Sequence, residues 1–117
     1  MNVTRLHAGP RMSQAVVHGD TIYVAGQVAD QAKGKGVGEQ TRDILAIIER
    51  LLAEAGSDKT RILSATIYLA DISTFAEMNA VWDAWVAAGH PPARATVEAK
   101  LAAPDFRVEI ACIAAKA

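Results

Sequence analysis

The chain has 117 residues, of which 51% are hydrophobic, and this size and composition suit one domain, residues 1–117, with its own core. Twelve Lys and Arg residues against thirteen Asp and Glu residues argue against the basic face that nucleic-acid binding needs and against a polybasic membrane patch. The single cysteine cannot form an internal disulfide, and we find no signal peptide and no apolar run that could cross a bilayer, so we expect a cytoplasmic protein.

The first half of the chain predicts a hairpin followed by a helix. In residues 14–28, two β-rich runs flank the dipeptide "GD", which suits a tight turn. Residues 30–38 form a polar, glycine-rich loop, and "GKGVG" within it lacks the strand-to-helix context of a phosphate-binding loop. In residues 39–56, apolar side chains recur at three- and four-residue spacing, which predicts a helix with Gly56 as its left-handed C-terminal cap.

The second half begins with a predicted strand and a second helix. Residues 61–71 are rich in the side chains that favour strands. Residues 73–89 predict an amphipathic helix that Gly89 ends, with Thr74 and Glu77 at capping-box spacing. The apolar stripe of this helix consists of Phe75, Met78, Trp82 and Trp85.

Two further strands, 93–101 and 107–115, complete the order β-β-α-β-α-β-β. We predict an α+β fold in which both helices pack on one face of a mixed sheet, because each helix has a single apolar face. Alternation along the last strand divides its side chains into Val108, Ile110, Cys112 and Ala114 on one face and Arg107, Glu109, Ala111, Ile113 and Ala115 on the other. The second set is partly apolar, so we expect another subunit to cover that face.

Two charged residues lie in the last two predicted strands. Arg94 offers a planar fork of donors that matches a carboxylate, and Glu109 alternates with apolar neighbours. Structural alternatives remain open: an edge-strand arginine paired with a neighbouring subunit, and a solvated or ion-paired glutamate. If the two strands form a hairpin around Pro104 and Asp105, Glu109 lies about 13–17 Å from Arg94 along the strand, opposite residue 98 or 99. A site using both would need two subunits, or a ligand and waters between them.

Other chemically capable residues have a simpler interpretation. The three histidines are scattered and show no metal-ligand spacing, so no metal site is predicted. Cys112 points with the apolar set of the last strand, so we expect a buried, unreactive thiol. Trp82 and Trp85 fit the apolar stripe and are predicted core residues.

The segment "PARATVEAKLAAPDFRVEI" resembles the signature of the RidA/YjgF/YER057c family: Pro-Ala-Arg, a hydrophobic alternation, a leucine, a short spacer and an aliphatic-Glu-Ile triplet. "GDTIYVAGQVA" is similar to the second strand of that family. "ILSATIYLADISTFAEMNAVW" is similar to its third strand and second helix. The resemblance covers nearly the whole chain.

The resemblance implies a chorismate-mutase-like fold and a homotrimer with clefts between subunits. The deaminating members of the family hydrolyse reactive enamines and imines, such as 2-aminoacrylate, to 2-oxo acids and ammonia, and they use no cofactor. Their arginine grips the substrate carboxylate and corresponds to Arg94. Their strand glutamate, implicated in positioning water, corresponds to Glu109. The implied partner is therefore a small 2-imino or enamino acid.

Five further positions are expected at the substrate, and four of them follow from the same resemblance. The Gly26 N–H is a candidate backbone donor, and Asn79 lies in the familiar Met-Asn pair. Ala25 stands where deaminating members often have serine, and Thr96 replaces a cysteine. The segment "GPRM" replaces Gly-Pro-Tyr, which leaves Met12 as the neighbouring wall. These changes predict a pocket that is selective among imines rather than inactive.

Alternatives to a general deaminase remain. One is a non-catalytic sensor that binds a small carboxylate in the same cleft, and another is a relative that processes an aminoacrylate-type intermediate within one pathway. Family members have also been described as RNA-acting inhibitors of translation, but the balanced charge of this chain disfavours that function.

Overall fold

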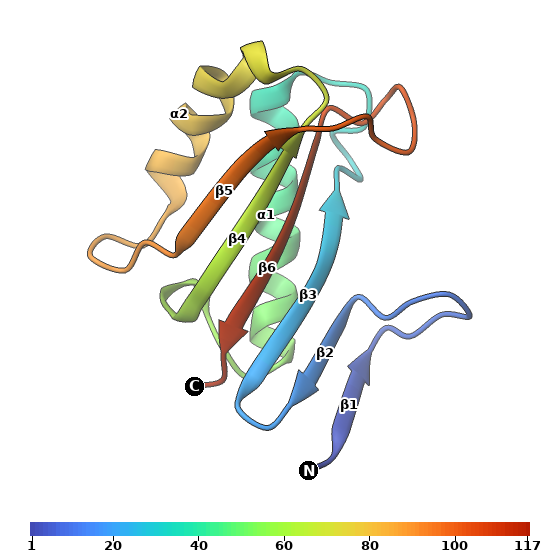
Figure 1. The fold of residues 1–117 in the computed structure, drawn as a ribbon, viewed down its shortest axis with the longest axis vertical. Helices are drawn as coiled ribbons and strands as arrows, with labels where there is room; N and C mark the ends of the chain where they lie inside the picture. The colour runs from blue at the N-terminus through green and yellow to red at the C-terminus, as the bar shows by residue number, and fades with distance from the viewer.

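The computed structural model describes residues 1–117 and contains one six-stranded sheet with two α-helices (Figure 1). The strand order across the sheet is β1-β2-β3-β6-β4-β5. Only β4 and β5 run parallel, so the sheet is mixed, as predicted. The elements are β1 (Val3–Leu6), β2 (Ala15–His18), β3 (Thr21–Val28), α1 (Val37–Glu54), β4 (Ile62–Leu69), α2 (Phe75–Trp85), β5 (Ala93–Glu98) and β6 (Val108–Ala115).

All seven predicted elements are present, and β1 is an additional strand that the sequence pattern did not reveal. The residues of β1 are exposed apart from half-buried Leu6, so an alternating apolar pattern is absent. Gly56 has a φ of 85°, which is the left-handed conformation expected after α1. The second helix ends at Trp85, four residues before the Gly89 that was expected to end it. Neither helix has the combined length and apolarity that a bilayer-spanning helix requires.

Both helices contribute to one hydrophobic core on one face of the sheet, which confirms the prediction. The strand β6 alternates strictly between buried and half-buried side chains, also as predicted. The face of the sheet opposite the helices remains open to solvent within the single chain. The core includes Ile44, Ile48 and Leu52 from α1, Met78 and Trp82 from α2, and Ile22, Ile67, Leu69, Val108, Ile110 and Cys112 from the strands.

The predicted capping box at the start of α2 is wrong. Glu77 instead accepts a hydrogen bond from the backbone N–H of Gly38 at 2.8 Å, in the first turn of α1. The Thr74 hydroxyl donates to the backbone oxygen of Asp71 at 2.6 Å. The first N–H groups of any helix lack intrahelical partners and favour a nearby negative charge, so α1 competes for the Glu77 carboxylate. The contact therefore joins the two helices.

The last two strands do not form a hairpin around Pro104 and Asp105, so that alternative is wrong. The chain passes from β4 through α2 to β5, and such a crossover brings β5 alongside β4 in parallel. The last strand then runs on the other side of β4, which lies between β5 and β6 (Figure 1). Arg94 and Glu109 therefore belong to strands that are not neighbours.

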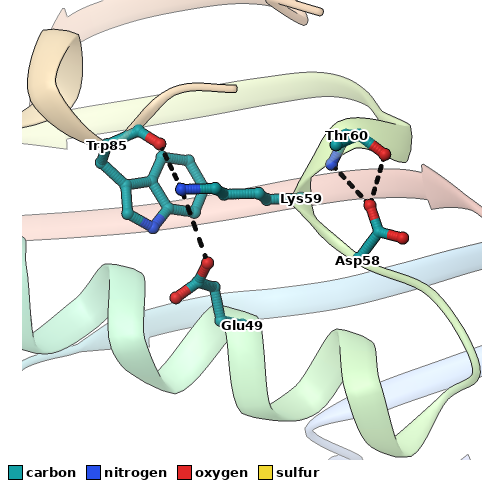
Figure 2. Close-up of polar contacts among 5 residues, drawn as sticks. All are labelled: Glu49, Asp58, Lys59, Thr60 and Trp85. Atoms are coloured by element: carbon teal, nitrogen blue, oxygen red, sulfur yellow. Dashed lines mark hydrogen bonds and ion pairs between the residues drawn. The ribbon is translucent and has the colours of Figure 1, made fainter. Parts of the chain in front are cut away.

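Lys59 ties the end of α2 to α1 and to the turn before β4 (Figure 2). Its ammonium donates a 2.6 Å hydrogen bond to the backbone oxygen of Trp85, the last residue of α2, and lies 5.2 Å from the centre of that tryptophan's ring system. A carboxylate oxygen of Glu49 in α1 lies 3.8 Å away. Beside it, the hydroxyl and backbone N–H of Thr60 bond to Asp58 and lower the pKa of that carboxyl.

We expect Lys59→Ala to destabilise the fold, because a hydrogen bond to a charged group contributes about 1.5–3 kcal/mol and this one satisfies a helix-terminal carbonyl. The side chain is 33% exposed, so screening places the expected cost near the lower end of that range. Urea denaturation measures the change. Lys35→Ala is the matched control, since its 3.8 Å pair with Glu39 is well exposed. Equal denaturation midpoints for both variants would contradict the assigned role.

Candidate functional site

Arg94 lies on the helix-covered face of the sheet, where three side chains of α2 hold it. Its Nη1 donates a 2.8 Å hydrogen bond to the Asn79 side-chain oxygen. The guanidinium carbon lies 5.2 Å from the centre of the Trp82 ring and 5.8 Å from that of Phe75. Positions 75, 79 and 82 have the i, i+4, i+7 spacing that places side chains on one face of a helix. None of the ion pairs in the chain involves Arg94, so its charge has no carboxylate partner.

Glu109 lies against a bulge in the neighbouring strand β3. Val24 pairs with Cys112 and Gln27 with Ile110, so two residues of β3, Ala25 and Gly26, face the single residue between them on β6. The Glu109 carboxylate rests directly over Gly26: a Cβ built on that glycine would lie 2.2 Å from Oε2. Gly26 and Glu109 therefore belong to one local arrangement, in which the absence of a side chain makes room for the carboxylate. No ion pair in the chain involves Glu109.

Arg94 and Glu109 project from opposite faces of the sheet. Arg94 pairs with Ala65 and Glu109 pairs with Tyr68, three residues further along β4, and successive strand residues alternate between faces. Ala65 is buried in the core, whereas Tyr68 is half-buried. Within one chain, the two candidate residues cannot contact the same small molecule.

Two cavities of the single chain lie away from both residues. One of about 490 Å³ lies between the start of α1 and α2 and is lined by Arg42, Glu77 and Trp85 among others. Another of about 520 Å³ lies under the β5–β6 connection, beside Lys100 and Phe106. Neither is lined by Arg94 or Glu109.

The loop that carries Met12 ends beside the bulge. The backbone oxygen of Gln14 accepts a 2.9 Å hydrogen bond from the N–H of Ala25. The buried Gln27 amide donates to the Gln14 side chain at 3.0 Å and to the Ala25 oxygen at 2.9 Å. Met12 itself is 48% exposed. Four of the residues selected from the sequence, Met12, Ala25, Gly26 and Glu109, thus come from adjoining segments.

The remaining two candidates, Asn79 and Thr96, lie on the Arg94 side. Thr96 follows Arg94 by two residues and shares its face of β5, and its buried hydroxyl makes no hydrogen bond. Contact between Thr96 and a substrate stays a prediction.

Sequence reasoning missed Phe75 and Trp82 as partners of Arg94 because it assigned them only to the apolar stripe. It also missed the amide contacts of Gln27, and the signal for these was a polar residue inside an apolar strand. No group of three metal-ligating side chains gathers anywhere in the chain.

Cys112 is buried in the core, which confirms the expected location, and burial raises the pKa of its thiol to about 12. Only about one thiol in ten thousand is then ionised at pH 8, and the thiolate is the reactive form. We expect iodoacetamide to leave Cys112 unmodified in the folded protein and to alkylate it in urea, as mass spectrometry measures. Because the folded pKa is raised, stability should fall as pH rises above about 9. Rapid alkylation without urea would contradict this.

A family model described as Endoribonuclease L-PSP matches residues 3–116. A "RutC family protein" of Haemophilus influenzae is 45% identical over 114 residues, which cover 97% of this chain and 98% of that protein. A Bos taurus protein named 2-iminobutanoate/2-iminopropanoate deaminase is 38% identical over 107 residues, 87% of this chain and 77% of that protein. The crystal structure of a YjgF family member from Neisseria meningitidis is similar with a TM-score of 0.96 and 50% identity, over 100% of this chain and 97% of that one.

The close structural match confirms the expected chorismate-mutase-like α+β fold. The family model and the relatives each cover most of the chain, and they agree with the resemblance carried by the segments around Gly26, Arg94 and Glu109. The chain belongs to the YjgF/RidA family, also described as the RutC or endoribonuclease L-PSP family.

Proposed function

We propose that this protein hydrolyses small 2-imino and enamino acids of the 2-aminoacrylate type to 2-oxo acids and ammonia. An enamine first takes a proton on carbon, loses one from nitrogen and so becomes the imine. Water then adds to the imine carbon, the carbon–nitrogen bond breaks, and nitrogen leaves as ammonia with the protons that water supplied. Imines already hydrolyse in water, so fixing the substrate and placing the water suffice to lower the barrier.

The observation that carries this proposal is the uncompensated charge of Arg94. Its guanidinium has five N–H donors, of which Asn79 occupies one, and no carboxylate neutralises it. Such a group suits the carboxylate that every 2-imino acid carries. The similarity to the bovine protein named as an iminobutanoate and iminopropanoate deaminase supports the same substrate class.

Glu109 is the proposed group that orients and deprotonates the attacking water. Its carboxylate lies over Gly26 without an ion pair, so its oxygens are available as acceptors. The Gly26 N–H, Ala25, Thr96 and Met12 complete the proposed pocket. With no tyrosine in "GPRM" and no hydroxyl at Ala25, the proposed pocket favours some imines over others.

We further propose a homotrimer whose clefts combine Arg94 of one subunit with Glu109 of another. The uncovered face of the sheet supports this, because apolar side chains such as Ile113 and Val97 lie on it beside Glu109. Tyr23 is 47% exposed and Val97 is 43% exposed. Light scattering should give about 37 kDa for three chains of 12.4 kDa. A measured mass of 12.4 kDa, that of one chain, would contradict a site shared between subunits.

The direct test is ammonia release from 2-iminopropanoate and 2-iminobutanoate generated in the cuvette by an amino acid oxidase. We expect faster release with the protein than with buffer, and different rates for aliphatic and aromatic imines. Binding of a 2-oxo acid without any acceleration would favour the non-catalytic sensor. Acceleration confined to one aminoacrylate-type substrate would favour the pathway-specific relative.

Mixing two inactive variants tests the shared site. Arg94→Ala and Glu109→Gln should each be inactive alone. If every site takes one residue from each of two neighbouring subunits, random trimers of the two variants regain about a quarter of the parent's sites. Ammonia release after co-refolding an equal mixture measures this. No recovery, although mixed trimers form, would show that one subunit supplies both residues.

A further inference from the structure

Asn79 is the residue from which the structure extends the proposed function. It was selected from the sequence as a substrate contact, yet its side-chain oxygen accepts the 2.8 Å hydrogen bond from Arg94. An arginine has no acceptor, so the amide must present its oxygen to the guanidinium. The Asn79 oxygen is thereby committed within the protein.

The other two contacts of the guanidinium are also electrically neutral. Trp82 and Phe75 lie 5.2 and 5.8 Å from its central carbon, at distances where a ring face attracts a cation. All three groups come from one face of α2, which packs into the core through Met78 and Trp82. A rigid helix face therefore holds the guanidinium through an amide oxygen and two rings, none of which carries a charge.

The neutrality of residue 79 is the informative detail. An aspartate has nearly the same shape and would make a stronger, charge-assisted bond to Arg94. It would also supply an internal counter-ion, and the guanidinium would then offer an anionic ligand much less attraction. An aspartate would thus neutralise Arg94 within the protein, whereas an asparagine leaves its charge for an anionic ligand.

We propose that Asn79 is a positioning residue that fixes the Arg94 guanidinium while leaving its positive charge free for the substrate carboxylate. This inference rests on the proposed function for the identity of the ligand. It assigns Phe75 and Trp82 the same supporting part, as neutral surfaces against which the planar group is oriented. None of the three contacts the reacting atoms.

The test compares Asn79→Asp and Asn79→Ala with the parent. Titration with 2-oxobutanoate, a product of the proposed reaction, measures anion binding. Asn79→Asp should weaken binding at least tenfold, since an ion pair replaces the free charge, and Asn79→Ala should weaken it about three- to tenfold by loosening the side chain. The control Ala76→Asp adds the same charge at an exposed position of α2 and should change binding less than twofold.

A second readout does not depend on the function. The NMR signal of the Arg94 Nη1–H, the group that donates to Asn79, is assigned by its loss in Arg94→Lys and reports whether the guanidinium is held. It should stay slow to exchange with water in Asn79→Asp and become fast in Asn79→Ala. If Asn79 only stabilised the fold, both variants would lower the melting temperature, and the exchange rate of the Arg94 signal would be the same in the two.

The outcomes are distinguishable. Parent-like binding by Asn79→Asp would overturn the inference, as would an Arg94 signal that is unchanged in Asn79→Ala. If the parent protein neither binds 2-oxobutanoate nor releases ammonia from imines, the proposed function fails. The NMR comparison then still decides whether Asn79 holds Arg94.

In an Arg94→Ala background, Asn79→Asp should have no further effect on binding, and an additive loss would contradict the coupling.

Discussion

Arg94→Ala is expected to lose one to two powers of ten in affinity for a 2-oxo acid and to lose most turnover. A charged hydrogen-bonded contact contributes about 1.5–3 kcal/mol, and Arg94 is the proposed carboxylate ligand. The affinity and turnover of Arg94→Lys should fall as well. Lysine keeps the charge but has neither the two-pronged donor set nor the flat group that lies against Trp82 and Phe75. Calorimetric titration and ammonia release measure both variants.

The control for Arg94 is Arg50→Ala, which removes an exposed arginine at the end of α1 and should leave binding and turnover unchanged. Arg94→Ala also loses the ring contacts, so a stability cost of about 1 kcal/mol is expected alongside the functional loss. Parent-like binding and turnover would refute the carboxylate-binding role. A collapse of the melting temperature or of trimer formation would instead favour the structural alternative, an arginine that holds α2 or a neighbouring subunit in place.

The periodic elements were predictable from the sequence because burial imposes their periods. The two helices follow from apolar side chains at three- and four-residue spacing, and the two faces of β6 follow from strict alternation. The exposed β1 lacks any such pattern, which is why it was missed. The pairing of β5 with β4 was missed because the short "PD" segment suggested a hairpin, whereas pairing is decided by packing of α2 across the sheet.

The site was predictable in its residue types but not in its arrangement. The bulge at Ala25 and Gly26 shifts the alternation of β3 and places Gln27 on the buried side, which no simple period indicates. From the sequence, Arg94 was expected only as a carboxylate ligand in a cleft, with no partner of its own inside the chain. Its long stem and flat head instead fit between aromatic side chains of α2, a pairing of distant segments that only the fold creates.

Gly26→Ala is expected to abolish most turnover while changing stability little. The new Cβ would lie 2.2 Å from Oε2 of Glu109, 2.9 Å from Cδ and 3.2 Å from Cγ, so the carboxylate must move. The φ of Gly26 is not in the left-handed region, and the clashing atoms end a flexible side chain, so the backbone tolerates alanine and the glutamate swings away. Displacing a general base costs about 10²–10⁴-fold in rate.

Glu109→Gln provides the comparison that assigns this loss to the carboxylate. Glutamine keeps the size but not the charge, so 2-oxo acid binding should survive while ammonia release falls by a factor similar to that of Gly26→Ala. Gly38→Ala is the matched glycine control: its new Cβ would meet nothing closer than 3.5 Å, and turnover should stay at the parent level. Because both changes would act through one carboxylate, Gly26→Ala should cause no further loss in a Glu109→Ala background. Full turnover by Gly26→Ala would show that the position of Glu109 over the bulge does not matter for the reaction.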